Sequence, residues 1–98
     1  MGNTARFIRN IYEERKAVVH LWEFIPPIDG HSFVFSSTVF CSYADDIYTC
    51  ETYFFPADGD TTVFSPTNWM ELSISRKNVI SAKACLLSQG FTILDYPW

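Results

Sequence analysis

The sequence predicts an α+β fold: an antiparallel sheet of four to five strands, with one helix packed on a face and an N-terminal helix. Two runs rich in β-branched and aromatic residues flank the polar pair Asp45-Asp46, the pattern of a β-hairpin. An apolar stripe at helical spacing precedes Gly90, as at the end of a helix. At 98 residues, the chain is expected to form one domain, residues 1–98.

The first element expected is a helix over residues 4–16. Apolar residues there recur at helical spacing, Asn3 or Thr4 can cap the first turn, and Glu-Glu-Arg-Lys at 13–16 favours helix. The alternative is a hairpin with strands at 7–12 and 17–24. The helix is preferred because Glu-Glu-Arg-Lys lacks residues that tolerate positive φ in a tight turn. Residues 17–25 then predict a strand that Pro26-Pro27 ends.

Residues 33–55 predict the central hairpin, with Asp45-Asp46 as its turn. This register places Tyr43 opposite Tyr48, Cys41 opposite Cys50 and Val39 opposite Thr52. Alternation between faces assigns these residues to the core: Phe33, Phe35, Val39, Cys41, Tyr43, Tyr48, Cys50 and Phe54. The other face collects Val34, Phe40, Glu51, Tyr53 and Phe55. It is too apolar to face solvent, so another segment or a partner is expected to cover it.

The remaining chain predicts loops, a strand, a helix and a last strand. Residues 56–62 read as a loop and 65–68 as a turn, with strands expected at 69–74 and 91–94. The helix is expected over residues 79–89, with Ser75 or Asn78 as its cap. Gly90 in the left-handed conformation would return Phe91 onto Leu86.

Composition narrows the function class. Hydrophobic residues make up 48% and charged residues 18%, which is typical of an ordered globular protein. No apolar run is long enough to span a membrane, and Arg6 and Arg9 lie where a secretion signal needs an apolar core. The three cysteines are then expected to be reduced thiols, in a cytoplasmic protein.

The distribution of charge is uneven. All seven Lys and Arg residues lie within 6–16 or 76–83, so residues 17–75 contain none. That interval carries eight carboxylates, whose field would repel nucleic-acid phosphates and attract a basic surface. The alternative is that the acidic residues only keep a small protein soluble.

Residues 37–89 resemble a family of small uncharacterised bacteriophage proteins. The similarity rests on Ser37-Thr38-Val39, Tyr48 with Glu51-Thr52, Phe55-Pro56, Asp58-Gly59, Trp69-Met70-Glu71-Leu72, and a helix containing Ala82 and Ala84. The helix lacks the acidic pair and histidine that such proteins often carry. The resemblance implies a phage setting, in which proteins that disable a host system are common.

No catalytic or metal-binding pattern is present in the sequence. His20, His31 and the cysteines lack the spacing of a zinc site, and no glycine-rich phosphate loop occurs. We therefore expect no enzyme activity, no cofactor and no direct nucleic-acid binding. The function expected is a phage-type inhibitor of anti-CRISPR or anti-restriction kind, which binds the basic nucleic-acid-binding surface of a host protein. The partner-binding residues expected are Asp45, Asp46, Glu51, Tyr53, Phe55, Asp58 and Asp60. The alternative is a module that self-associates through its outer hairpin face.

Overall fold

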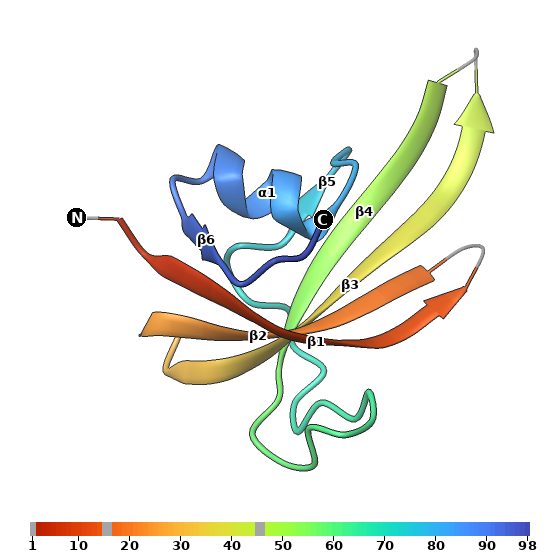
Figure 1. The fold of residues 1–98 in the computed structure, drawn as a ribbon. Helices are drawn as coiled ribbons and strands as arrows, with labels where there is room; N and C mark the ends of the chain where they lie inside the picture. The colour runs from red at the N-terminus through yellow and green to blue at the C-terminus, as the bar shows by residue number, and fades with distance from the viewer. Residues whose placement is uncertain (1, 15–16, 45–46) are drawn as a thin grey trace.

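Two long hairpins form most of one curved sheet in this computed structural model (Figure 1). The structure describes residues 2–14, 17–44 and 47–98, without the side chains of residues 40–49. Its elements are β1 Thr4–Glu14, β2 Ala17–Ile28, β3 His31–Ala44, β4 Ile47–Pro56, β5 Arg76–Lys77, α1 Ala82–Ser88 and β6 Thr92–Leu94. The sheet order is β5-β4-β3-β2-β1-β6. The pairing of β1 with β6 is parallel, so this six-stranded sheet is mixed. The expected α+β fold, an antiparallel sheet of four to five strands with a packed helix, is therefore wrong: the described chain is mostly sheet, with one short helix.

The expected N-terminal helix is also wrong, because residues 4–14 form β1, which pairs antiparallel with β2. The hairpin alternative describes this region correctly. The pairing shifts between Phe7 and Arg9 and again between Asn10 and Tyr12, so Ile8 and Ile11 are extra residues in β1. Such β-bulges break the two-residue alternation of a strand. The resulting apolar spacing at Phe7, Ile8 and Ile11 imitates a helical stripe.

The prolines do not end β2, which continues to Ile28 through a cis Ile25–Pro26 bond. The ladder with β3 is interrupted instead, between Glu23 and Ile28. This gap contains Pro26 and Pro27, and proline has no N–H to donate to a ladder. The expected strand is thus confirmed, and its expected end is not.

The central hairpin is confirmed, but its register holds only near the tip. Tyr43 lies opposite Tyr48 as expected, whereas a shift between Phe40 and Ser42 places Cys50 opposite Phe40 instead of Cys41. Val39 consequently faces Glu51 rather than Thr52. The expected turn, Asp45-Asp46, lies outside the described residues.

This one-residue shift changes which side chains share a face. Phe35 lies opposite Phe55, and Ser36 lies opposite Phe54, so the expected grouping of Phe35 with Phe54 is wrong. Val34 and Phe54 belong to one buried cluster, whereas Phe35 belongs to another. Both faces of the hairpin therefore carry a core.

The larger core lies on the concave side of the sheet, beneath α1 and β6 (Figure 1). Its buried residues are Ala5, Trp22, Phe24, Val34, Phe54, Leu72, Ile74, Ala82, Cys85, Leu86 and Phe91. Within it, the indole Nε1 of Trp22 donates a hydrogen bond of 2.8 Å to Ser36 Oγ. A buried Trp N–H needs such a partner, so this bond sets how the ring lies in the core.

The opposite side of the sheet is covered by residues 57–70, which form no strand or helix and lie below the sheet in Figure 1. Val19, Leu21, Phe35 and Ala57 make the small buried cluster there, with Phe64 packed against it. The strand expected at 69–74 is wrong. Leu72 N–H bonds to Phe54 O at 2.8 Å, and from there the chain passes to the concave side, where Leu72 and Ile74 are buried.

The C-terminal helix is shorter than expected. α1 begins after Ser81, whose hydroxyl accepts a hydrogen bond from Ala84 N, so neither Ser75 nor Asn78 is its cap. Asn78 has φ 57°, which is incompatible with a helix at that residue. Gly90 at φ 86° and the Phe91 N–H bond to Leu86 O confirm the expected helix end. In the described chain, no helix is long and apolar enough to cross a membrane.

Candidate functional site

Three of the expected partner-binding residues lie on one face of β4. Glu51, Tyr53 and Phe55 alternate along the strand, and the Tyr53 hydroxyl donates a hydrogen bond to the Glu51 carboxylate. Asp58 and Asp60 follow in the loop after β4, and the rise along a strand places Pro56 about 17 Å from Glu51. Asp45 and Asp46 lie outside the described residues. The structure therefore does not gather the expected carboxylates at one point.

Asp58 and Asp60 hold the loop in shape. Asp58 Oδ2 lies 2.5 Å from His31 Nδ1, and Asp60 Oδ1 accepts hydrogen bonds from Thr62 Oγ1 at 2.5 Å and Thr62 N at 2.9 Å. The Thr62 hydroxyl and N–H lower the pKa of Asp60 below its ordinary value. Both side chains remain exposed, so their charge still contributes to the surface field.

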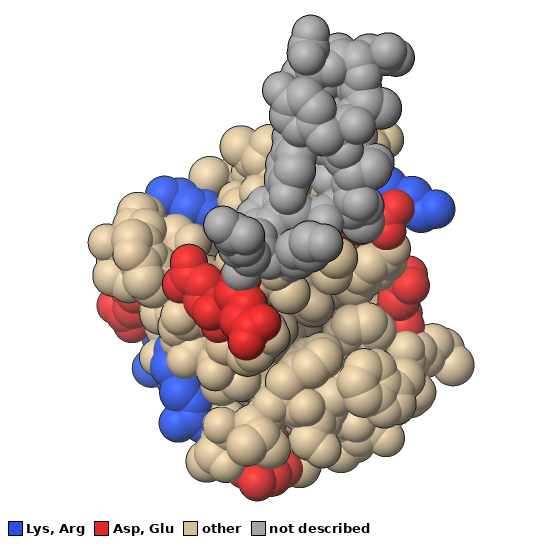
Figure 2. Space-filling view, turned by 90° about the vertical axis from the view of Figure 1, so that its right-hand side faces the viewer, with Lys and Arg blue, Asp and Glu red and all other residues tan. Residues whose placement is uncertain are grey.

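Carboxylates are dispersed on the face drawn in Figure 2, around a broad area that has no Asp, Glu, Lys or Arg. Lys and Arg lie at the edges of the same view. The carboxylates seen on this face therefore do not form one continuous patch.

Phe55 is not an exposed anchor. Its ring is 9% exposed and contacts Phe64 at 6.1 Å and Trp69 at 5.7 Å between ring centroids. The expectation that another segment covers the outer hairpin face is thus confirmed for Phe55, which residues 57–70 of the same chain cover, whereas Val34 is buried on the concave side instead. The exposed position in this stack belongs to Trp69, which is 65% exposed.

We call Tyr53, Val63, Phe64, Trp69 and Met70 the outer aromatic patch. Met70 is 70% exposed and Val63 is 53% exposed, so both extend the surface around Trp69. The sequence expectation missed Val63, Trp69 and Met70, because it placed Trp69 and Met70 in a strand at 69–74 and gave Val63 no binding role. Their signal was two apolar pairs, at 63–64 and 69–70, on either side of the turn at 65–68, whose proline prevents a continuous strand.

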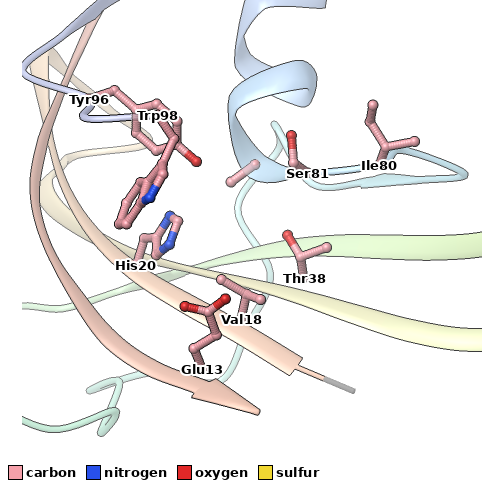
Figure 3. Close-up of a pocket in the computed structure, with 9 residues that line it drawn as sticks. Glu13, Val18, His20, Thr38, Ile80, Ser81, Tyr96 and Trp98 are labelled. Atoms are coloured by element: carbon pink, nitrogen blue, oxygen red, sulfur yellow. The ribbon is translucent and has the colours of Figure 1, made fainter. Parts of the chain in front are cut away.

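A second candidate site is a cavity of about 250 Å³ on the concave side, which we call the His20 pocket (Figure 3). It lies between the β1–β2 hairpin, β3, the start of α1 and the C-terminal residues. Its lining residues are Glu13, Val18, His20, Thr38, Ile80, Ser81, Ala82, Tyr96 and Trp98. The sequence expectation assigned no role to this set, since residues distant in sequence meet there only after the sheet curves.

His20 lies inside a group of aromatic rings. Its imidazole stacks on Trp98 with 5.7 Å between centroids and 8° between planes, and Phe7 meets it edge-on at 5.1 Å. The residue is 6% exposed, and its Nδ1 has no hydrogen-bond partner among the described residues. Burial lowers the pKa of His20, while the nearby Glu13 carboxylate acts in the opposite direction.

Glu13, His20 and Ser81 line the same pocket without forming a catalytic triad. Ser81 Oγ caps α1 by accepting from Ala84 N at 3.1 Å, and no hydrogen bond links the three side chains to one another in the described structure. A triad requires the nucleophile and base to be within hydrogen-bond reach. Over the described ranges, no group of three His, Cys, Asp or Glu residues is placed to hold a metal ion.

Trp98 and Tyr96 close the upper side of this pocket (Figure 3). Tyr96 stacks on Trp22 with 5.6 Å between centroids, and Lys83 Nζ lies 5.2 Å from the Tyr96 ring centre and 3.0 Å from Trp98 O. These contacts hold the C-terminal residues against the sheet. A comparison with protein-family models found no match, and neither a curated protein nor a solved structure matched the chain.

Proposed function

We propose that this protein acts by binding another protein, whose docking surface is basic and handles nucleic acid. In this proposal the chain is a phage-type inhibitor that works in the host cytoplasm against a defence system, such as a CRISPR effector or a restriction enzyme. The observation that carries the proposal is the outer aromatic patch, exposed within an interval that has no Lys or Arg.

Trp69 supplies the anchor in this proposal. Its indole is 65% exposed, yet Phe55 and Phe64 support it from below, with centroids 5.7 and 5.6 Å away. A large aromatic side chain on such a support enters a partner's pocket at low entropic cost, and Trp is enriched among residues that dominate interface energy. Met70 adds an adaptable apolar contact beside it.

Charge supports the choice of a basic partner. Asp60 and Glu71 are exposed in the segment that bears the patch, whereas Arg9, the cation bonded to that segment, is turned onto the carbonyl of Thr61. Dispersed carboxylates attract a basic surface and speed its association, while the buried aromatic contact sets the lifetime of the complex. The resemblance of residues 37–89 to phage proteins adds the host setting.

Site-directed photocrosslinking tests the proposal. A benzophenone side chain at position 69 would be compared in host cells with the same group at Leu87, which is 51% exposed on α1 and outside the patch. Position 69 should capture a nucleic-acid-binding protein that position 87 does not. The purified partner should then lose DNA or RNA binding when this protein is added. It should keep that binding when the Trp69→Ala variant is added instead.

Two results would overturn the proposal. One is capture at position 69 of a protein with no affinity for nucleic acid. The other is a captured partner that keeps full nucleic-acid affinity in the presence of saturating protein.

Self-association is the second candidate, favoured by the same exposed apolar surface. Two copies joined through Trp69, Met70 and Val63 would bury side chains that are now more than half exposed. Light scattering should then show a dimer that Trp69→Ser dissociates. A strict monomer at high concentration contradicts this candidate and leaves the inhibitor proposal standing.

A further inference from the structure

Most polar side chains that line the His20 pocket can accept a hydrogen bond, and the indole N–H of Trp98, which only donates, is the exception. The Glu13 carboxylate only accepts, and the hydroxyls of Thr38, Ser81 and Tyr96 accept as well as donate. Among the described residues, no Lys or Arg side chain lines the pocket. A ligand that complements the Glu13 carboxylate carries a hydrogen-bond donor and positive charge.

His20 provides an independent sign that a donor belongs there. The residue is 6% exposed and its Nδ1 has no partner within the described chain, although buried polar groups are normally paired. Figure 3 shows the nitrogen-bearing edge of the ring turned toward the space bordered by Ser81 and Thr38. Burial lowers the pKa of His20, so the ring is neutral near pH 7 and one nitrogen can accept a hydrogen bond.

The apolar part of the lining suits the remainder of such a ligand. Val18, Ala82 and Ile80 lie beside the polar atoms, and Trp98 offers an aromatic surface at the rim. Ile80 is 76% exposed and Trp98 is 62% exposed, so an aliphatic stem could leave the pocket between them. A cation near the Trp98 ring would also gain from its electron-rich face.

We propose that the His20 pocket binds a protonated alkyl amine. Its ammonium group donates hydrogen bonds to Glu13 and His20, and its aliphatic stem packs against Ile80 and Trp98. The source of the amine is either a free small molecule or a lysine side chain of a partner. The inference is independent of the proposed function, because the pocket and the outer aromatic patch lie on opposite sides of the sheet.

The primary test compares n-pentylammonium chloride with 1-pentanol, which has nearly the same shape and no charge. NMR would follow the His20 ring protons and the Trp98 indole N–H at pH 7.5, with sodium chloride matched in every sample. Saturable shifts should appear at concentrations at least tenfold lower for pentylammonium than for pentanol. Equal affinity for the two probes would overturn the proposal, because it would make the pocket merely apolar.

Neighbouring carboxylates provide a matched pair of variants. Glu13→Gln should weaken pentylammonium binding by about tenfold or more, since one charged hydrogen bond is lost. Glu14→Gln removes the same charge from the next residue, which does not line the pocket, and should leave the affinity within about twofold. Both exposed variants should keep the wild-type melting temperature. Equal effects of the two variants would mean that Glu13 acts only through the net charge of the protein, and would exclude a site at Glu13.

A pH series and a peptide complete the test. Glu13 from β1 and Tyr96 from the C-terminal residues face His20, and Lys83 lies over the Tyr96 ring. Protonation of His20 below its lowered pKa should repel the ammonium, so affinity should fall on acidification, and the amine should lower that pKa further. Affinity that does not change with pH would remove His20 from the site.

A Gly-Lys-Gly peptide that binds tenfold better than pentylammonium would indicate a partner lysine. Comparable or weaker binding of the peptide would indicate a free amine.

Discussion

At the residue scale, two adjacent leucines of α1 have opposite surroundings. Leu86 is completely buried in the concave core, whereas Leu87 is 51% exposed. Leu86→Ala should lower the free energy of unfolding by about 2 to 5 kcal/mol, because it removes buried methyl groups and leaves a cavity. Leu87→Ala should change it by no more than about 0.5 kcal/mol. Denaturant titration measures both, and equal losses would contradict this orientation of α1.

His20 should also make stability depend on pH. Its folded-state pKa lies below the ordinary value of 6.5, first because of burial, with Glu13 acting in the other direction. Between the two values the unfolded chain binds more protons, so stability is complete above about pH 6.5 and is lost as the pH falls. His20→Phe keeps an aromatic ring and should flatten this dependence between pH 7 and 5. An unchanged pH profile in His20→Phe would exclude His20 as its source.

At the element scale, α1 depends strongly on its ends because it has only seven residues. So short a helix has little stability of its own and needs its caps and its packing. Ser81→Ala should cost about 1 kcal/mol by leaving Ala84 N without its acceptor. Ser81→Asp keeps an acceptor oxygen and should restore most of the loss in thermal unfolding. If Ser81→Asp is as unstable as Ser81→Ala, the cap is not the cause.

The two bulges of β1 also explain why this strand was expected to be a helix. Its two bulges add Ile8 and Ile11, which pack on the outer cluster, whereas Phe7 contacts His20 and Trp22 on the concave side. One strand thus supplies both cores. Local periodicity cannot distinguish that arrangement from a helix, since a bulge is decided by pairing with the neighbouring strand.

At the scale of the whole molecule, the curved sheet separates two surfaces with different chemistry. The outer aromatic patch lies on residues 53–70, and the His20 pocket lies on the concave side with α1. If the patch binds a basic partner, Glu71 should contribute to association through its charge. Glu71→Gln and Glu71→Lys should slow association progressively at low salt, by about tenfold for Lys, with little effect on folding.

Salt distinguishes this effect from a change in contact. Screening shortens the reach of a charge to about 8 Å at physiological ionic strength, so the three proteins should associate at similar rates at high salt. Stopped-flow measurement of the association rate with the identified partner provides the test. Equal rates for all three at low salt would mean that the carboxylates are ordinary surface and that charge does not select the partner.

Sequence alone was sufficient wherever a feature depends on neighbouring residues. It determined the hairpin around Asp45-Asp46, the strand that begins at Ala17, the helix end at Gly90 and the interval without Lys or Arg. Tertiary structure decided the bulges, the register of the central hairpin on the side of Ser42 away from the tip, the parallel pairing of β6 and the burial of Phe55 beneath Trp69. It also assembled the His20 pocket from four separate segments. The physical reason is that turns and caps are satisfied by local hydrogen bonds and backbone angles, whereas register, curvature and cavities depend on how distant side chains pack.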